Sequence, residues 1–500
     1  MTSFATVPEL LRHVASIQSE REAFVEGEHR LSFRELDINA DRVAWMFWDF
    51  GVRPGNVVAL MLPSSIDYAI CYHGAMRLRA ITSGINLRLG QTEISHILDR
   101  LQPALTVLDD GLAIPSGCGL ALRRSQIRPM GGPAPSHFDL VSPQADDPVA
   151  IVWTGGTTGK PKGAVFDHRN LKAVALGTQE ISLAGDRRYG PVPFPHVNFM
   201  TRCWDEIGRL VTIVIAQHPW SARIALQTIL AERVNVIPMV PTQWALLFRL
   251  PEFEAADLSR VRLVYTGGSN VPAELVMRIK NRLGCPVVVR YASTEIGVGT
   301  GTHVNDPPEV VENTVGKPVA GVEISLTDES ENAVARGRVG RIRCRSAAVM
   351  RRYWRDPDLT KQVLSPDGWL STGDLGWVDD DDNLHIAGRM SDMYIRGGYN
   401  VYPIEVEGAL SKHPAVIQAA VVGVPDSVLG EIGVAFIVAS DHSLNPDELR
   451  QWCSSLIADY KLPDAFLMVP ELPLTSVNKI DKRALQPIAA EFRATQTRRK

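Results

Sequence analysis

One segment of this chain reads Thr154-Gly155-Gly156-Thr157-Thr158-Gly159-Lys160-Pro161-Lys162-Gly163. It follows residues 149–153, Val-Ala-Ile-Val-Trp, an apolar run typical of a strand that is buried on both faces. The glycines expose backbone N–H groups, the threonines add hydroxyl donors, and the two lysines supply positive charge. This combination predicts a strand that ends in a loop suited to a polyphosphate.

A P-loop of the kinase and ATPase type is the natural alternative, and its spacing can be tested. A P-loop needs a Gly, four residues, and then Gly-Lys-Ser/Thr at the start of a helix. Here only three residues separate Gly155 from Gly159, and Pro161 stands where the magnesium-binding hydroxyl belongs. The spacing therefore excludes a P-loop.

A second predicted strand ends in a sequence similar to that of the first. Tyr265-Thr266-Gly267-Gly268 again leads from an aromatic residue and a threonine into paired glycines. Open α/β sheets bind ligands at the carboxyl ends of their strands, where glycines let a ligand approach the backbone. Amphipathic helices alternate with short β-rich runs through the first half of the chain, which predicts an α/β fold with a mostly parallel sheet. Strands are predicted at residues 57–62, 149–153, 234–240, 262–266 and 286–291.

Two helices can be predicted together with their caps. After Gly90, apolar residues recur at helical spacing, and Thr92 is the expected N-terminal cap. Near the C-terminus, Asn445 is the expected cap of a second helix, with Pro446 in the first turn and Glu448 completing a capping box. The apolar stripes are Ile94, Ile97, Leu98 and Leu101 in the first helix, and Leu449, Trp452, Cys453 and Leu456 in the second.

Composition restricts the class of protein. A chain of 500 residues is long enough for several domains, and its 45% hydrophobic and 22% charged content is ordinary for a globular protein. The formal net charge of -4 argues against a nucleic-acid-binding protein, which usually carries an excess of Lys and Arg. The cysteines lack metal-binding spacings, and no segment has the character of a signal peptide or a membrane span. A reducing cytoplasm is the expected location.

Four further stretches, together with the glycine-rich loop, resemble the adenylate-forming superfamily of acyl- and aryl-CoA synthetases, luciferases and peptide-synthetase adenylation domains. They are Tyr291-Ala292-Ser293-Thr294-Glu295, Ser371-Thr372-Gly373-Asp374, residues 388–405 from Gly388-Arg389 to Glu405, and residues 473–482. The resemblance implies a large multi-subdomain N-terminal α/β domain, residues 1–390, that binds ATP and the acyl group. A smaller mobile α+β C-terminal domain, residues 391–500, would carry the catalytic lysine. Past about residue 320 the predicted β segments become shorter and the turns become more charged. The segment Arg389-Met390-Ser391-Asp392 is the expected domain boundary.

The resemblance also implies how adenylation works. A carboxylate must attack an α-phosphate that is itself negative, so cations have to offset the repulsion. Glu295 resembles the family's magnesium ligand, and Thr158 lies where a hydroxyl supports the metal and the phosphates. Lys479 resembles the lysine that bridges the attacking carboxylate and the α-phosphate. The ATP-binding residues implied by the resemblance are Thr154, Gly155, Gly156, Thr157, Thr158, Gly159, Lys160, Lys162, Gly268, Ser269, Tyr291, Ala292, Ser293, Thr294, Asp374, Arg389 and Lys479.

Within that set, Tyr291 resembles the aromatic residue that stacks on adenine, with Gly268 and Ser269 in the loop beside it. Asp374 resembles the carboxylate that accepts the ribose hydroxyls, and Arg389 its partner. Asn478 stands where the family usually has Gly before the lysine. Because Asn tolerates left-handed backbone better than other non-glycine residues, the turn is expected to survive.

The thiol step rests on a different set of residues. In the family the small domain rotates and brings a glycine-containing hairpin to the thiol tunnel, which here implies Arg396, Gly397, Gly398 and Tyr399, followed by Asn400, as the coenzyme A site. Ser391 resembles the hinge, where Asp or Lys is more common. His196 resembles the histidine between the acyl pocket and the thiol path, and a purely structural histidine is the alternative.

The acyl pocket is expected after His196 and around residues 240–242. Its lining residues would be His196, Val197, Phe199, Trp204, Val240, Thr242, Gly267 and Ala292. Phe199 and Trp204 would either shorten the pocket toward a compact aromatic or alicyclic acid or belong to the core. Arg202 could meet a polar distal group, although a surface helix position explains it more simply.

The leading hypothesis is an AMP-forming acid:CoA ligase that uses ATP, Mg2+ and coenzyme A on a fatty, aromatic or alicyclic acid, in fatty acid or lipid metabolism. The first alternative loads a phosphopantetheinyl carrier protein from the same adenylate. The second is a non-catalytic adenylate-binding protein, suggested by Asn478 and Ser391. The expected partners are these small molecules, with no nucleic acid and no transmembrane segment, and a homodimer is compatible with the sequence.

Overall fold

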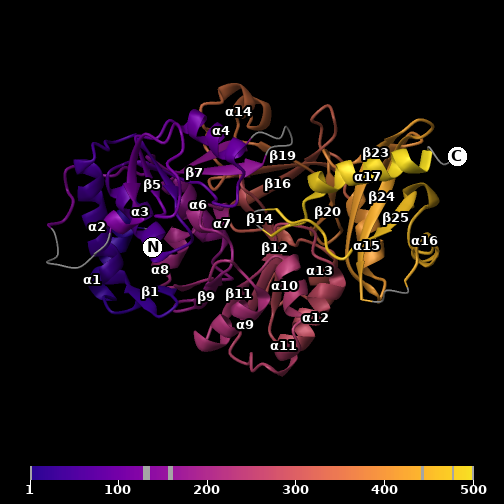
Figure 1. Cartoon of the computed structure of the whole chain (residues 1–500), viewed down its shortest axis with the longest axis horizontal. Helices are drawn as coiled ribbons and strands as arrows, with labels where there is room; N and C mark the ends of the chain where they lie inside the picture. The colour runs from indigo at the N-terminus through magenta and orange to yellow at the C-terminus, as the bar shows by residue number, and fades with distance from the viewer. Residues whose placement is uncertain (1–2, 128–135, 156–160, 441–443, 476–477, 498–500) are drawn as a thin grey trace.

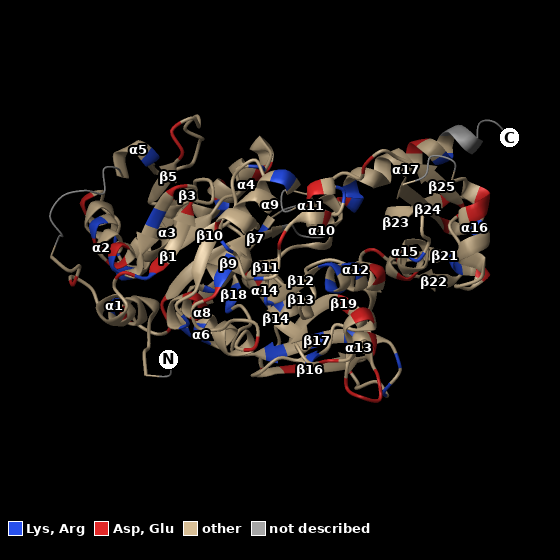
Figure 2. Cartoon of the chain, turned by 90° about the horizontal axis from the view of Figure 1, so that it is seen from below, with Lys and Arg blue, Asp and Glu red and all other residues tan. Residues whose placement is uncertain are grey.

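The structure is a computed structural model of the chain, and it describes residues 3–127, 136–155, 161–440, 444–475 and 478–497. Within these residues the strands form four sheets. Figure 1 shows three of the sheets in the larger part of the molecule and the fourth in the orange and yellow C-terminal part. In Figure 2 the positions of basic residues, blue, and of acidic residues, red, occur in both parts of the chain.

The first sheet has seven strands in the order β18-β8-β7-β4-β3-β5-β6. Its strands are β3 (Val57–Met61), β4 (Ile81–Gly84), β5 (Leu105–Leu108), β6 (Leu120–Arg123), β7 (Pro148–Gly155), β8 (Pro161–Asp167) and β18 (Arg352–Tyr353). The strands β4, β3, β5 and β6 are parallel, and β7 pairs antiparallel with β8. The predicted phosphate loop therefore joins the two strands of a hairpin.

The second sheet has nine strands in the order β15-β14-β13-β12-β11-β9-β10-β1-β2. Its strands are β1 (Glu22–Glu26), β2 (His29–Ser32), β9 (Arg187–Gly190), β10 (Thr212–Ile215), β11 (Val236–Pro238), β12 (Leu263–Gly267), β13 (Val287–Ser293), β14 (Gly297–Gly301) and β15 (Lys317–Pro318). Its centre is parallel, so β12 and β13 end side by side, with Gly267 opposite Arg290. The two glycine-rich strand ends predicted from the sequence thus belong to two different sheets.

Helices cover these two sheets and bury their apolar stripes in continuous cores. They are α1 (Val7–Ile17), α2 (Phe33–Asp49), α3 (Ile66–Arg77), α4 (Gln91–Leu101), α5 (Arg124–Ile127), α6 (His168–Gly177), α7 (Val197–Met200), α8 (Cys203–Gly208), α9 (Ala222–Ala231), α10 (Pro241–Leu247), α11 (Pro251–Ala255), α12 (Ala273–Leu283) and α13 (Pro308–Asn313). Helices α1 and α2 begin at Thr6 and Ser32, each of which forms a capping box with the Glu three residues later.

The third sheet is antiparallel and links the larger part of the chain to the smaller part. It contains β16 (Val322–Thr327), β17 (Gly340–Ser346), β19 (Leu370–Val378) and β20 (Leu384–Arg389), and α14 (Pro357–Val363) lies between β18 and β19 in the chain. Its last strand ends at Arg389, which pairs with Asp374 of β19 across the sheet.

The fourth sheet belongs to the small C-terminal domain. Its strands are β21 (Tyr394–Arg396), β22 (Tyr399–Val401), β23 (Val416–Asp426), β24 (Gly430–Ala439) and β25 (Ala465–Met468). The helices are α15 (Pro403–Ser411), α16 (Pro446–Ser454), α17 (Lys482–Thr497) and the short 3-10 helix η1 (Asp459–Lys461). Apolar cores of its own lie on both faces of this sheet. The predicted fold class, a large α/β domain with a smaller α+β domain, is confirmed.

Several local predictions need correction. Residue Thr92 lies inside α4, which is capped instead by Gly90, whose backbone N–H donates to the Glu93 carboxylate. Asn445 caps α16 as predicted, but the Glu448 side chain lies 3.7 Å from His413 and does not complete a capping box. Leu456 lies beyond the end of α16 and is 45% exposed, so it is not part of the buried stripe. The predicted strand 234–240 shortens to β11.

Two findings bear on the compartment that the composition suggested. The six cysteines are free and buried. Among the described residues, the helices include none that is long and apolar enough to cross a membrane.

Candidate active site

The small domain reaches the carboxyl ends of β12 and β13 through Lys479. A Cβ added to Gly268, in the loop after β12, would lie 3.3 Å from Lys479 Nζ. Asn478 has the left-handed φ of +61° that the sequence suggested it would tolerate. Its Oδ1 accepts a hydrogen bond of 2.9 Å from Arg88 Nη1 of the large domain. The turn that carries Lys479 is therefore in contact with the large domain on both sides.

Lys479 has a lower pKa than an ordinary lysine. Burial, and then the nearby Arg389 guanidinium, lower the pKa of Lys479 to about 8. Burial and the positive charge of Lys479 in turn lower the pKa of His196 to about 3, so its imidazole is neutral at pH 7. His196 caps α7, where its Nδ1 accepts a hydrogen bond of 3.2 Å from the Asn198 backbone. His196 and Lys479 thus belong to one electrostatic site.

A buried carboxylate lies beside these groups at the edge of the third sheet. Asp374 Oδ2 accepts a hydrogen bond of 2.7 Å from the Tyr291 hydroxyl, and Asp374 Oδ1 lies 3.0 Å from Arg389 Nε. Burial raises the pKa of Asp374, while Arg389 and Tyr291 act in the opposite direction. Tyr291, Asp374 and Arg389 come from β13, β19 and β20, so two sheets meet at this point.

Glu295 forms a third group of polar contacts just after β13. Its Oε1 accepts a hydrogen bond of 2.8 Å from the Tyr353 hydroxyl, and its carbonyl accepts one of 2.8 Å from the Met350 N–H. Lys162 Nζ lies 5.8 Å from the centre of the Tyr353 ring. Tyr353, on the two-residue strand β18, therefore connects Glu295 to the hairpin that carries the glycine-rich loop. Sequence reasoning missed this tyrosine.

The two ends of the predicted phosphate loop face each other. Thr154 pairs with Lys162, and Gly155 with Pro161, across the β7–β8 hairpin. The loop residues Gly156, Thr157, Thr158, Gly159 and Lys160 lie outside the described residues. The remaining predicted nucleotide residues, Ser269, Ala292, Ser293 and Thr294, follow the ends of β12 and β13 or form the end of β13 itself.

The predicted acyl-pocket residues fall into two groups. Gly267, Ala292, Val197, Val240 and Thr242 lie at the ends of β12 and β13 or in the first turns of α7 and α10. A Cβ at Gly267 would collide with the carbonyl oxygen of Arg290, so only glycine fits there. By contrast, Phe199 stacks on Phe194 with ring centroids 3.6 Å apart, and Trp204 is fully buried beneath Lys172. Both of these aromatic side chains pack in the main core.

Arg202 is not at a surface position, contrary to the simpler explanation offered by the sequence. It is buried at the start of α8, where its Nη2 lies 2.7 Å from Asp205 Oδ2. Its Nη1 donates to the Tyr265 hydroxyl at 2.7 Å. The prediction failed because Tyr265 is 63 residues away in the sequence and meets Arg202 only in the folded chain.

The predicted coenzyme A residues form the β21–β22 hairpin. Gly397 and Gly398 make its turn with φ values of +57° and +87°. Arg396 binds Asp464 with two hydrogen bonds of 2.9 and 2.8 Å, and the Tyr399 ring stacks on Tyr460. These partners all belong to the small domain. The structure therefore places Lys479, and not the hairpin, at Gly268. Ser391 lies just before the hairpin and donates to the Asp392 carboxylate at 2.9 Å.

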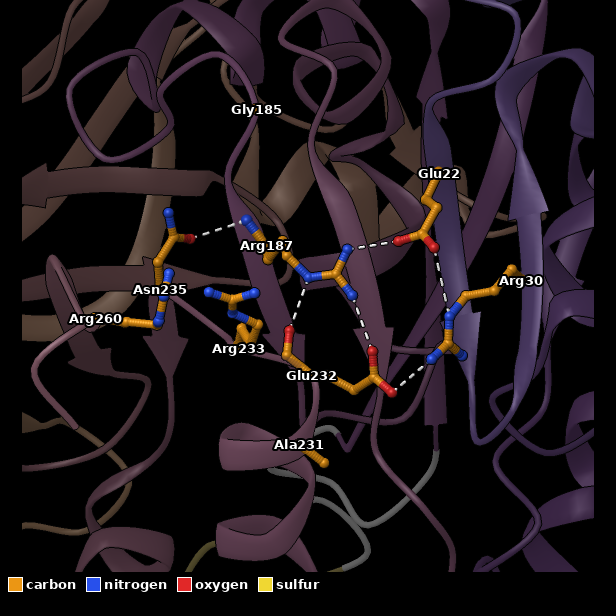
Figure 3. Close-up of a pocket in the computed structure, with 9 residues that line it drawn as sticks. All are labelled: Glu22, Arg30, Gly185, Arg187, Ala231, Glu232, Arg233, Asn235 and Arg260. Atoms are coloured by element: carbon orange, nitrogen blue, oxygen red, sulfur yellow. Dashed lines mark hydrogen bonds and ion pairs between the residues drawn. The ribbon is translucent and has the colours of Figure 1, made fainter. Parts of the chain in front are cut away.

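A hollow of about 750 Å3 lies at the amino ends of strands of the second sheet, opposite to the candidate active site (Figure 3). Arg187 and Asn235 stand at or before the amino ends of β9 and β11. In Figure 3, Arg187 and Arg30 are bridged by Glu22 and Glu232, which offset their charge. This hollow is remote from the carboxyl ends where ligands of open α/β sheets bind, and we do not assign it to the active site.

The fold is a large α/β domain with a smaller domain whose Lys479 reaches the loop after β12. Residues 11–354 match the family model "AMP-binding enzyme", and residues 405–479 match "AMP-binding enzyme C-terminal domain". The chain therefore belongs to the AMP-binding enzyme family, the adenylate-forming superfamily that the motifs resembled.

Relatives of known activity align along nearly the whole chain. A long-chain-fatty-acid–CoA ligase of Mycobacterium tuberculosis is 29% identical, over 95% of this chain and 97% of its own length. A feruloyl-CoA synthase of an Amycolatopsis species is 32% identical, over 91% and 93%. The crystal structure of an anthranilate CoA ligase in complex with anthranoyl-AMP is 25% identical, with a TM-score of 0.88 over 98% of both chains.

Proposed function

We propose that this protein is an AMP-forming acid:CoA ligase. It activates a carboxylic acid with ATP to an acyl-adenylate and then transfers the acyl group to coenzyme A. The observation that carries the proposal is the contact of Lys479 with the Gly268 loop, next to the Asp374, Tyr291 and Arg389 cluster. A lone ammonium group beside a nucleotide site is the arrangement that acyl-adenylate formation requires.

The first half-reaction joins the acid to AMP. A carboxylate oxygen of the acid attacks the α-phosphorus of ATP, the bond from that phosphorus to the bridging oxygen breaks, and pyrophosphate leaves with the electron pair. The Lys479 ammonium would lie between the carboxylate and the α-phosphate. There its positive charge would offset the repulsion between these two negative groups. Asp374 would accept the ribose hydroxyls, Arg389 would hold its carboxylate in place, and Tyr291 would stack on adenine.

The residues at Glu295 fit a magnesium ion that accompanies ATP. Its Oε2 receives no hydrogen bond from any residue that the structure describes, and a free carboxylate oxygen is a suitable ligand. Thr158, outside the described residues, is the proposed second contributor. When bound, the ion supplies positive charge that offsets repulsion among the phosphate oxygens. Tyr353 would hold Glu295 in position for it.

The second half-reaction needs a different arrangement of the two domains. The coenzyme A thiol loses its proton to solvent and its sulfur attacks the acyl carbon, the bond from that carbon to the phosphate oxygen breaks, and AMP leaves with the electron pair. We propose that residues 391–500 turn as a body about Ser391, which withdraws Lys479 and brings residues 396–399 to the site. His196, kept neutral at pH 7 mainly by burial, would line the path between the acyl pocket and the thiol.

The acceptor and the compartment belong to the same proposal. The fatty-acid and feruloyl relatives described above are CoA ligases, which favours free coenzyme A over a carrier protein. Buried free cysteines are compatible with a reducing cytoplasm. A fatty, aromatic or alicyclic acid is the proposed substrate class, since relatives act on a long-chain fatty acid, on ferulate and on an indenyl-propanoate.

The test is coenzyme A-dependent release of AMP from ATP across a panel of fatty, aromatic and alicyclic acids. Acid-dependent exchange of pyrophosphate into ATP measures the first step separately. Exchange together with thioester formation is the expected result. Exchange followed by transfer only to a phosphopantetheinyl protein would support the carrier-loading alternative. The absence of exchange with every acid would leave the non-catalytic alternative.

A further inference from the structure

Arg290 is a buried cation on β13, immediately before Tyr291. Its side chain is only 7% exposed, and its Nε is buried without a hydrogen-bond partner among the described residues. Within the described chain, no carboxylate lies within the 4.0 Å ion-pair distance of its guanidinium. Burial lowers the pKa of Arg290 to about 10, which is still far enough above pH 7 to leave it charged.

Other buried arginines of the same domain are paired. Arg188 Nη2 lies 2.5 Å from Glu206, Arg202 Nη2 lies 2.7 Å from Asp205, and Arg77 pairs with Asp37. An unpaired buried charge is unfavourable by several kcal/mol, roughly what is lost when one partner of a buried pair is removed. These other buried arginines are paired with carboxylates of the same domain. Arg290 has no such partner among the residues that the structure describes, so it is the position where an anion from outside the protein could bind.

Arg290 lines a small hollow of about 40 Å3 between α6 and the strands β14 and β15. Leu176 and Gly177 end α6 on one side, and Gly301 ends β14 on the other. A Cβ at Gly301 would collide with Arg290 Nη1, so glycine keeps the space open. A buried water needs on the order of 10–15 Å3 on this measure, so the hollow has room for a carboxylate group.

The charges around the hollow favour an anion. Lys317 also lines it, and the one acid at its rim, Glu180, lies 2.9 Å from His303. Glu180 makes no ion pair with Arg290 within 4.0 Å, but its charge raises the pKa of Arg290, and the charge of Arg202 lowers it. Two cations, Arg290 and Lys317, therefore line the hollow against one acid, which already has a partner.

One face of the second sheet carries Arg290 together with residues of the predicted acyl pocket. Side chains alternate along a strand, so Arg290 and Ala292 face one side of β13 while Tyr291 faces the nucleotide side. Gly267 is the β12 neighbour of Arg290, and Tyr265 lies on the same face of β12. Tyr265 contacts Arg202, which stands six residues after His196. Arg290 thus shares a sheet face with Ala292 and lies beside Gly267, two residues of the predicted acyl pocket.

We propose that Arg290 binds a second carboxylate at the far end of the acid, so that the preferred substrate is a dicarboxylic acid. This inference rests on the proposed function and names the substrate class of the same site. The guanidinium can donate two parallel hydrogen bonds to such a carboxylate, which fixes the length and direction of the acid as well as its charge. The first carboxylate is then the one presented to the α-phosphate.

The experiment compares dicarboxylic acids with monocarboxylic acids of the same chain length, aliphatic and aromatic, in pyrophosphate exchange. In the native protein the dicarboxylic acid is expected to have a kcat/KM higher by about tenfold or more, the value of a hydrogen bond to a charged group. Arg290→Met should remove that preference, mainly by raising KM for the dicarboxylic acid, while leaving the monocarboxylic acid unchanged. Arg290→Lys should restore part of it.

Arg338→Met, at an exposed position before β17, is the matched control and should change neither ratio. Equal losses with both kinds of acid in Arg290→Met would mean a structural arginine and would overturn the inference. A native preference for monocarboxylic acids would overturn it as well, even if the Met variant failed to fold. Stimulation of monocarboxylic acid exchange by free acetate or phosphate would show that the hollow takes a separate anion. If no acid supports exchange, the proposed function itself fails.

Discussion

Asn478 sets the backbone that presents Lys479. Its φ of +61° falls in the left-handed region, which costs a residue such as Ala about 1–2 kcal/mol and glycine much less. We therefore predict that Asn478→Gly preserves pyrophosphate exchange, whereas Asn478→Ala lowers its kcat by up to about tenfold. Steady-state exchange rates for the two variants measure this difference.

Arg88→Met provides the control, because it removes the 2.9 Å hydrogen bond to Asn478 Oδ1 without changing the backbone. If Asn478→Ala and Arg88→Met are equally impaired, the side-chain contact matters and the left-handed backbone does not. Full activity in Asn478→Ala would contradict the prediction directly.

The pKa of Lys479 should be measurably low. Burial and Arg389 disfavour the ammonium, so we expect the charge to be lost as the pH rises through about 8, far below the usual value near 10.4. The rate of adenylation, which needs the charged form, should then fall above that pH. Conversely, the free energy of docking Lys479 becomes more favourable as the pH rises from 8 toward 10. In this range the docked lysine has lost its proton, whereas an undocked lysine still binds one.

Carbon-13 NMR of the reductively methylated protein can follow this titration, with Lys479→Ala used to assign the signal. Arg389→Gln should raise the midpoint, since it removes a like charge from the surroundings of the ammonium. A midpoint near 10 in the native protein would mean that Lys479 is solvated in solution and not docked at Gly268.

Residues that act within one motif could be predicted from the sequence, whereas residues that act through a distant partner could not. Glu295 and Asp374 stand inside short motifs, and in the structure Asp374 accepts a hydrogen bond from Tyr291 of another motif. Tyr353 reaches Glu295 from 58 residues away and has no motif of its own. Arg202 and Arg290 likewise acquire meaning only from the strands and helices packed against them.

At the scale of elements, the β21–β22 hairpin has a turn whose backbone a ligand could approach closely. Gly397 and Gly398 turn the chain with positive φ, and the turn is anchored by Arg396 to Asp464. We predict that Gly398→Ala leaves pyrophosphate exchange within about twofold of the native rate and reduces thioester formation by about tenfold, because an L-residue at φ of +87° is strained. Parallel assays of exchange and of thioester formation give both numbers.

Gly408→Ala, on helix α15 with no atom within 4 Å of an added Cβ, is the control for the hairpin variant. It lies in the small domain and should affect neither step. If Gly398→Ala impaired exchange as much as thioester formation, the hairpin would be a general structural element and would have no special place in the thiol step.

Element types were easier to predict than their ends. The apolar runs at β7, β12 and β13 were located to within about two residues because parallel strands buried on both faces leave a continuous apolar signal. The cap of α4 was misassigned because the Glu93 carboxylate caps the helix from within its first turn and makes a side-chain cap unnecessary. The two-residue strand β18 is too short to leave any pattern.

At the scale of the whole molecule, the two domains meet in an arrangement that brings Lys479 to the large domain. The small sheet has its own cores, and yet Lys479 at its edge reaches the Gly268 loop of the large domain. Figure 1 shows β12, β14 and β20 in the middle of the molecule, between the two parts. The sequence carries the motifs of both domains but not their mutual placement, since that depends on contacts between residues as distant as Arg88 and Asn478.

This arrangement predicts that the two half-reactions can be separated by one substitution. Lys479→Ala should lower acid-dependent pyrophosphate exchange by about 100-fold or more, the usual loss when a charge-stabilising group leaves an active site. Formation of the thioester from supplied acyl-adenylate and coenzyme A should stay within about threefold of the native rate, because Lys479 is then withdrawn from the site. Lys412→Ala, an exposed lysine at the end of α15, is the control and should leave both steps intact. Equal loss of both steps would mean that Lys479 holds the domains together instead of acting on the α-phosphate, and it would remove the main support for alternation between two arrangements.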